Sequence, residues 1–115
     1  MKSGSIVLAR IQQADGRIKT RPVVILQEMP PFSDFLVCAV SSQLRHECHG
    51  FDEVMYSGDD DFPASGLKVS SLIRLGLVAT IPKSMILGGL GVISLERLQI
   101  LRTRLAGHIK THNPA

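Results

Sequence analysis

The sequence predicts one α+β domain, mainly β, in which about five short antiparallel strands form a small, strongly bent sheet or barrel and a C-terminal amphipathic helix packs on it. Three observations support this prediction. The chain has 115 residues, which suits a single domain. Its apolar runs are short, with little chain between them, which is typical of antiparallel strands. A helical spacing of apolar residues is found near the C-terminus.

The first two strands are predicted on either side of a polar turn. Residues 4–11 (GSIVLARI) are apolar and β-rich, and an Asp15-Gly16 turn signal follows them. Pro22 has no backbone N–H to give to a sheet, so the second strand is expected to begin at it or just after it. We therefore predict this strand over residues 21–27.

The remaining β structure follows from prolines and apolar runs. Pro30 and Pro31 permit neither a helix nor a central strand, which predicts a loop over residues 28–34. The apolar run FLVCAV, residues 35–40, predicts a third strand covered on both faces. Farther along, the chain predicts in order a short edge strand at 51–56, a loop at 57–64 and β-type runs over 67–81.

A flexible turn is predicted at residues 88–91 (GGLG), and a helix after it. Ser94 resembles a helix N-cap, and Glu96 lies in the first turn, where the helix dipole favours an acid. Apolar residues then recur at helical spacing and form one stripe, which consists of Leu98, Leu101, Leu105 and Ile109. Four basic residues lie largely outside this stripe, namely Arg97, Arg102, Arg104 and Lys110. The last residues, THNPA, are expected to fray.

Charge is distributed unevenly along the chain, whose net charge is +3. Between His46 and Leu67 there are six acids and no Lys or Arg, and all thirteen Lys and Arg residues lie elsewhere. Two interpretations stay open. The molecule offers a basic face to a polyanion, or it has a solvated surface with one acidic loop.

The apolar runs are too short and too interrupted to span a membrane. The N-terminus becomes polar too early for a signal peptide, so we expect a cytoplasmic protein. Two cysteines, Cys38 and Cys48, fit a reducing compartment, and a disulfide between them stays open as an alternative.

Several familiar catalytic patterns do not occur. The spacing of Cys38, His46, Cys48 and His49 does not match that of zinc sites. There is no GxSxG nucleophile motif, no phosphate-binding Walker loop and no dinucleotide-binding glycine motif. We therefore expect no metal and no cofactor.

The most informative pair is Arg21 and Ser41. If the second and third strands form a hairpin, Arg21 opens it and Ser41 closes it, so both lie at the same open end. A guanidinium beside hydroxyls suits a phosphate group. Arg17, Lys19 and Arg45 are near enough in sequence to extend the positive field. The alternative is an ordinary surface arginine and a serine that ends a strand.

The chain also resembles the MazF/PemK (Kid) family, the toxin halves of bacterial toxin–antitoxin pairs. The resemblance rests on five segments in order: GSIVLARI, KTRPVVIL, VCAVSSQ, SGLKVSSLIRLGLVATI and GGLGVISLERLQILRTRL. It implies an SH3-like barrel with helices, a homodimer and a cognate antitoxin. It also implies a metal-independent endoribonuclease that cuts single-stranded RNA at short sequences, an mRNA interferase.

The resemblance assigns roles to particular residues. The family's Arg-Pro arginine falls on Arg21 and its strand-ending threonine on Ser41, and a catalytic arginine of PemK-type members falls on Arg74. Arg21 would stabilise charge on the scissile phosphate, and Ser41 would hydrogen-bond it or help move a proton. The 2′-hydroxyl of the RNA would be the nucleophile, giving a 2′,3′-cyclic phosphate and a 5′-hydroxyl. The expected RNA-binding residues are Arg17, Lys19, Ser42, Gln43 and Arg45.

The sequence departs from the family pattern in one later strand. Gly76, Leu77 and Ala79 stand where family members often have an acid, a Gln and an Arg. An alternative function therefore stays open, that of a non-catalytic member that binds RNA or a protein target, as the structural relative CcdB poisons gyrase without cutting. The Arg21 and Ser41 pair favours the enzyme, and the changed positions favour the binding protein.

Overall fold

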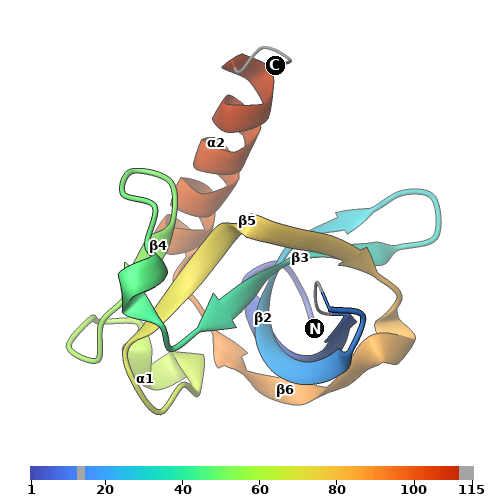
Figure 1. The fold of residues 1–115 in the computed structure, drawn as a ribbon, viewed down its shortest axis with the longest axis horizontal. Coiled ribbons are helices and arrows are strands. Elements are labelled where there is room, and N and C mark those ends of the chain that lie inside the picture. The colour runs from blue at the N-terminus through green and yellow to red at the C-terminus, as the bar shows by residue number, and fades with distance from the viewer. Residues whose placement is uncertain (13–14, 112–115) are drawn as a thin grey trace.

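The computed structural model describes residues 1–12 and 15–111, which form one six-stranded antiparallel sheet and a long C-terminal helix (Figure 1). The strand order is β4-β5-β3-β2-β1-β6. The strands are β1 (Ser5–Gln12), β2 (Ile18–Met29), β3 (Asp34–Ser41), β4 (Glu53–Met55), β5 (Ser71–Ile81) and β6 (Ile86–Val92). The helices are α1 (Phe62–Ser65) and α2 (Leu95–Thr111), and two 3₁₀ turns cover Leu44–His46 and Lys83–Met85.

The predicted class, mainly β with a C-terminal helix, is confirmed, and β4 is the predicted edge strand. The turn at Asp15-Gly16 is also confirmed, because the Arg17 N–H donates to the Asp15 carboxylate at 3.0 Å and Gly16 has a φ of 86°. The expected fraying of residues 112–115 lies outside the described residues. No helix in the described part of the chain is long and apolar enough to cross a membrane.

The prediction of a turn at residues 88–91 is wrong, and this adds a sixth strand. These residues belong to β6, which pairs with β1 through an irregular register that includes Leu8↔Gly88 and Val7↔Gly89. Glycines weaken a strand, but they also let another backbone approach closely. A Cβ atom at Gly91 would overlap the backbone of α1 at Ala64 and Ser65. The tertiary contact therefore explains Gly91, whereas a Cβ atom at Gly88 or Gly89 would meet nothing within 4 Å.

The sheet bends strongly but does not close by strand pairing, since β4 and β6 are its two edges. Helix α1, inside the region predicted as a loop, and the residue after it pack on β6 instead. Gly66 has a φ of 72°, and a Cβ atom there would overlap the backbone of Leu90. Two glycine positions, Gly66 and Gly91, thus hold the chain around α1 against β6. We call this contact the glycine contact.

The prediction that β2 begins near Pro22 is also wrong, because the strand begins at Ile18. Residues 18–22 pair with β1, whereas pairing with β3 begins only at Val23, opposite Ala39. Pro22 therefore marks the end of the β2–β3 ladder rather than the end of the strand. At this position its missing N–H does not interrupt the pairing with β3.

Alternation along the strands produces a core on each face of the sheet. One face carries Val24, Val40 and Ile73, and α2 covers it with the buried side chains of Leu98 and Leu101. The other face carries a second cluster that includes Val23 and Val37. Both clusters exclude water from the middle strands, as the continuous apolar run of β3 predicts.

Helix α2 follows its predicted start but not the full length of its predicted stripe. The Arg97 N–H donates to Ser94 Oγ at 3.1 Å, which confirms the N-cap. Leu105 is partly buried, but Ile109 is 71% exposed because the last turns extend beyond the sheet (Figure 1). The stripe prediction is therefore wrong at Ile109.

Candidate functional site

Arg21 and Ser41 lie at the same open end of the β2–β3 hairpin, as the sequence predicts. Val23 pairs with Ala39, and Arg21 and Ser41 each lie two residues farther toward this end. Because side chains alternate in a strand, both belong to the sheet face that carries Val23. The two side chains therefore face the same space.

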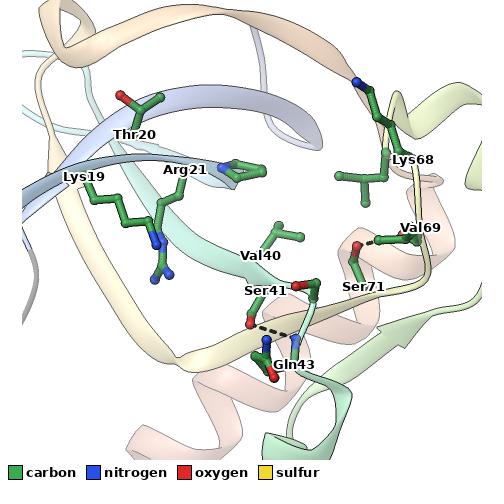
Figure 2. Close-up of a pocket in the computed structure, with 12 residues that line it drawn as sticks. Lys19, Thr20, Arg21, Val40, Ser41, Gln43, Lys68, Val69 and Ser71 are labelled. Atoms are coloured by element: carbon green, nitrogen blue, oxygen red, sulfur yellow. Dashed lines mark hydrogen bonds between the residues drawn. The ribbon is translucent and has the colours of Figure 1, made fainter.

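That space is a pocket of about 400 Å³. Its first wall is the start of β2, its floor is the end of β3, and its other wall is the chain before β5 (Figure 2). The volume is in the range of pockets that bind small molecules. The polar residues that line it are Lys19, Thr20, Arg21, Ser41, Ser42, Gln43, Lys68 and Ser71.

Arg21 is only partly satisfied by the protein. Among the residues that the structure describes, its Nε is a buried side-chain nitrogen without a hydrogen-bond partner. Leaving a buried donor unpaired costs about 1–3 kcal/mol. The Arg21 residue also lines the pocket, where a guanidinium is well suited to bind an oxyanion.

The Ser41 hydroxyl is oriented by the backbone. Its Oγ accepts a hydrogen bond from the Gln43 N–H at 3.1 Å, as the dashed line in Figure 2 shows. This contact uses an oxygen lone pair, so the hydroxyl proton is available to donate to a ligand. The same turn places Gln43 at the pocket.

The structure brings together some of the predicted site residues and separates others. Lys19, Ser42 and Gln43 line the pocket, but Arg17, Arg45 and Arg74 do not. Arg17 is exposed, with its Nε 3.7 Å from Asp15 Oδ2, and Arg45 is exposed on the first 3₁₀ turn.

Arg74 lies close to the pair in the sheet but outside the pocket lining. It pairs with Ala39, whereas Ser41 pairs with Leu72, so Arg74 is one row away from Ser41 on the same face. Its side chain is half-buried. The beginning of β5 thus adds a third polar residue to this face.

Sequence reasoning missed Thr20, Lys68 and Ser71. Thr20 lies between two predicted site residues in the sequence, and this position could have indicated that it lines the site. Lys68 and Ser71 reach the pocket from a segment far along the chain, and no local pattern marks them. Their contribution depends on the pairing of β5 with β3.

The acidic segment is neutralised away from the pocket. The Arg97 guanidinium contacts three carboxylates, of Glu53, Asp59 and Asp61, at 3.2, 3.0 and 2.9 Å. Arg104 contacts Glu53 at 3.0 Å. Hydrogen bonds from Arg97 lower the pKa of Asp61 from 3.8 to about 2.

Among the described residues that line the pocket, by contrast, there is no carboxylate. Arg97 and Arg104 bind Glu53, Asp59 and Asp61 away from the pocket, so these three carboxylates do not offset its positive charge. This arrangement favours the interpretation of a basic face for a polyanion.

The residues of the unmatched zinc pattern are dispersed. Cys38 is buried in the core, where burial raises the pKa of its thiol to about 12, and Cys48 is exposed. Both thiols are free. Within residues 1–12 and 15–111, no group of three or more His, Cys, Asp or Glu residues is arranged to hold a metal ion.

The fold and the pocket define a small barrel-like β protein with a basic, acid-free pocket at the end of one hairpin. Residues 2–109 match the model of the family described as PemK-like, MazF-like toxin of type II toxin–antitoxin system. The match covers nearly the whole chain, and the chain belongs to this family. The resemblance noted in the sequence is thereby confirmed.

Solved structures support the fold. The chain is similar to an endoribonuclease in complex with its cognate antitoxin from a mycobacterial species, with a TM-score of 0.71, 14% identity and 99% of each chain covered. It is also similar to the Mycobacterium tuberculosis toxin MazF-mt6, with a TM-score of 0.69, 17% identity and coverage of 95% of this chain and 99% of that chain. No curated protein sequence matches the chain.

Proposed function

We propose that the protein is a metal-independent endoribonuclease that cuts single-stranded RNA at a specific short sequence, the toxin of a toxin–antitoxin pair. The observation that carries the proposal is the unpaired, buried Nε of Arg21 beside the oriented hydroxyl of Ser41. Arg21 and Ser41 line one pocket, and a guanidinium and a hydroxyl can both donate hydrogen bonds to a phosphate bound there. Membership in the toxin family and the endoribonuclease among the similar structures agree with this activity.

The proposed reaction uses the RNA's own 2′-hydroxyl as nucleophile. Its oxygen forms a bond to the adjacent phosphorus, and the bond from phosphorus to the 5′-oxygen of the next nucleotide breaks. The products are a 2′,3′-cyclic phosphate and a 5′-hydroxyl, and the proton lost by the nucleophile balances the one gained by the leaving oxygen. Arg21 stabilises the added charge on the phosphate, Ser41 donates a hydrogen bond to it, and Arg74 adds positive charge from the next row.

RNA cleavage in excess EDTA, followed by analysis of the product ends, tests this proposal. Cleavage with 2′,3′-cyclic phosphate ends is the expected result. Products with 3′-hydroxyl and 5′-phosphate ends, or cleavage that requires a divalent ion, would contradict the mechanism.

A second candidate function is binding without cleavage, either to RNA or to a protein target in the manner of a CcdB-like gyrase poison. The acid-free lining of the pocket favours it, since no carboxylate is there to act as a general base. Leu77, which replaces a polar residue of the family pattern, is 37% exposed. RNA that binds through Arg21 and remains uncut with all sequences tested would establish this candidate.

The proposed partners are single-stranded RNA, a cognate antitoxin and a second copy of the chain. We propose that the antitoxin lies over the same basic pocket, so that inhibition and RNA binding are mutually exclusive. We also propose that the toxin acts in the cytoplasm, where its RNA substrate is found. Competition between the antitoxin and labelled RNA tests the shared site.

A further inference from the structure

Lys68 lines the wall of the pocket that lies across from Arg21 (Figure 2). Lys19 and Arg21 extend from β2 on one side, Ser41 lies between, and Lys68 comes from the segment before β5 on the other side (Figure 2). Within the described part of the chain, no carboxylate forms a salt bridge with Lys68 or Lys19. The pocket thus has positive charge on both walls.

The backbone that carries Lys68 is held in place. On one side of it, the Leu67 N–H donates to Ser65 Oγ at 3.1 Å, and Gly66 forms part of the glycine contact with β6. On the other side, Ser70 Oγ accepts a hydrogen bond from the Ser57 N–H at 2.8 Å. The exposed Lys68 side chain therefore starts from a fixed point across from Arg21.

Positive charge on both walls is more than one phosphate requires. Arg21 and Ser41 suffice to hold a single phosphate group, and Lys68 stands on the other side of a pocket of about 400 Å³. RNA carries a phosphate at every nucleotide, so a strand that crosses the pocket presents a further phosphate to the second wall. The walls contain no acid to repel it.

We propose that Lys68 binds a second phosphate of the RNA strand, adjacent to the scissile phosphate held by Arg21 and Ser41. This inference rests on the proposed ribonuclease function. It makes Lys68 a binding residue that touches the substrate away from the bond that breaks. The strand then crosses the pocket from the β2 wall to the wall before β5.

Salt dependence of binding tests the second phosphate contact. The probe is a fluorescent 20-nucleotide RNA of mixed sequence with 2′-O-methyl groups, which lacks the nucleophile and stays intact. Removing one phosphate contact lowers the slope of log affinity against log salt by about 0.7 for a single strand and weakens binding about fivefold near 0.1 M salt. We expect both effects in Lys68→Ala and neither in Lys110→Ala, an exposed lysine on the last turn of α2.

Lys68→Arg keeps the charge and should retain the wild-type slope. An unchanged slope in Lys68→Ala, with wild-type protein that binds the probe, overturns the inference and leaves the ribonuclease proposal standing. Wild-type protein that binds the probe but cuts no unmodified RNA overturns the ribonuclease proposal instead. Failure of the wild type to bind the probe overturns the inference about Lys68, and cleavage of unmodified RNA then decides the ribonuclease proposal.

Kinetics with unmodified RNA separate binding from chemistry. If Lys68 holds a second phosphate, Lys68→Ala raises KM and leaves kcat within about twofold, because the contact is the same in the ground state and the transition state. A large fall in kcat at saturating RNA would instead place Lys68 at the reacting phosphate and overturn the inference. Circular dichroism of each variant confirms that the fold is kept.

Discussion

Arg21 and Ser41 each lie two residues beyond Val23–Ala39, the last pair of the β2–β3 ladder, and both line the same pocket. The pairing register fixes this relationship, so neither a flexible loop nor a distant segment has to fold to create it. A phosphate bound there meets a guanidinium from one strand and a hydroxyl from the next.

Replacing Arg21 by methionine should abolish cleavage without a loss of stability. The change removes the charge that stabilises the phosphate and also removes a buried nitrogen that has no partner. We expect the free energy of unfolding to stay equal or to rise by up to about 1 kcal/mol. Urea denaturation and RNA cleavage, measured on the same preparation, check both parts. Wild-type cleavage by the folded variant would refute the proposed site.

Ser41→Ala should slow cleavage roughly tenfold to a hundredfold, the value of one hydrogen bond to a charged group. Ser41→Thr should retain activity, because threonine keeps the hydroxyl and is well suited to a strand. Single-turnover rates at saturating RNA give the comparison. Equal losses in both variants would show that the shape of the side chain matters rather than its hydroxyl.

Gly76→Asp should increase cleavage by at least tenfold, since one general acid or base contributes about 10²–10⁴ in rate. The backbone at Gly76 does not have the left-handed conformation, and a Cβ atom there meets nothing within 4 Å. An aspartate therefore fits without strain. Gly76→Asn is the matched uncharged control. Equal rates in the wild type and both variants would mean that no acid is missing at this position.

The bond between Asp61 and Arg97 should appear in the pH dependence of stability. The pKa of Asp61 is lowered to about 2 in the folded protein, against an ordinary value of 3.8. Because the folded pKa is the lower one, the stabilisation is present above pH 3.8 and is lost as the pH falls through about 2. Unfolding free energies between pH 5 and 2 should fall less in Asp61→Asn than in the wild type. Asp60→Asn, an exposed neighbour, should follow the wild type.

The protein should be a homodimer. Several large apolar side chains of β6 and α2 are exposed, among them Leu87, Leu95 and Ile100, and a second copy would bury them. Sedimentation at micromolar concentration should give twice the monomer mass of 12.5 kDa. A mass of one chain under these conditions would rule the dimer out.

The parts of the site that sequence reasoning predicted are those fixed by local geometry. Arg21 and Ser41 flank two strands joined by a short loop, so a hairpin brings them to one end whatever the rest of the chain does. The position of Lys68 at the pocket depends instead on the pairing of β5 with β3, which no sequence motif predicts. The same is true of Arg97, which lies 36 residues from Asp61.

The two wrong strand predictions also have a physical origin. Local propensity disfavours glycine in a strand, yet Gly91 serves a close backbone approach that is visible only in three dimensions. Pro22 ends pairing on one side of β2 and leaves the other side intact. Sequence rules describe how a residue affects its own strand. The formation of β6 and the early start of β2 depend instead on the elements that pack or pair with them.

The glycine contact gives the Lys68 wall of the pocket an anchor that the wall of Arg21 and Ser41 does not share. The wall of Lys68 is anchored by packing against β6, whereas Arg21 and Ser41 are anchored by the pairing register of the central strands. Residues 67–70 precede β5 and take no part in its ladder. The length and charge of this segment can therefore vary while the pairing register of β5 with β3 stays the same. Selection can therefore alter which RNA is retained without altering the residues that we propose cut it.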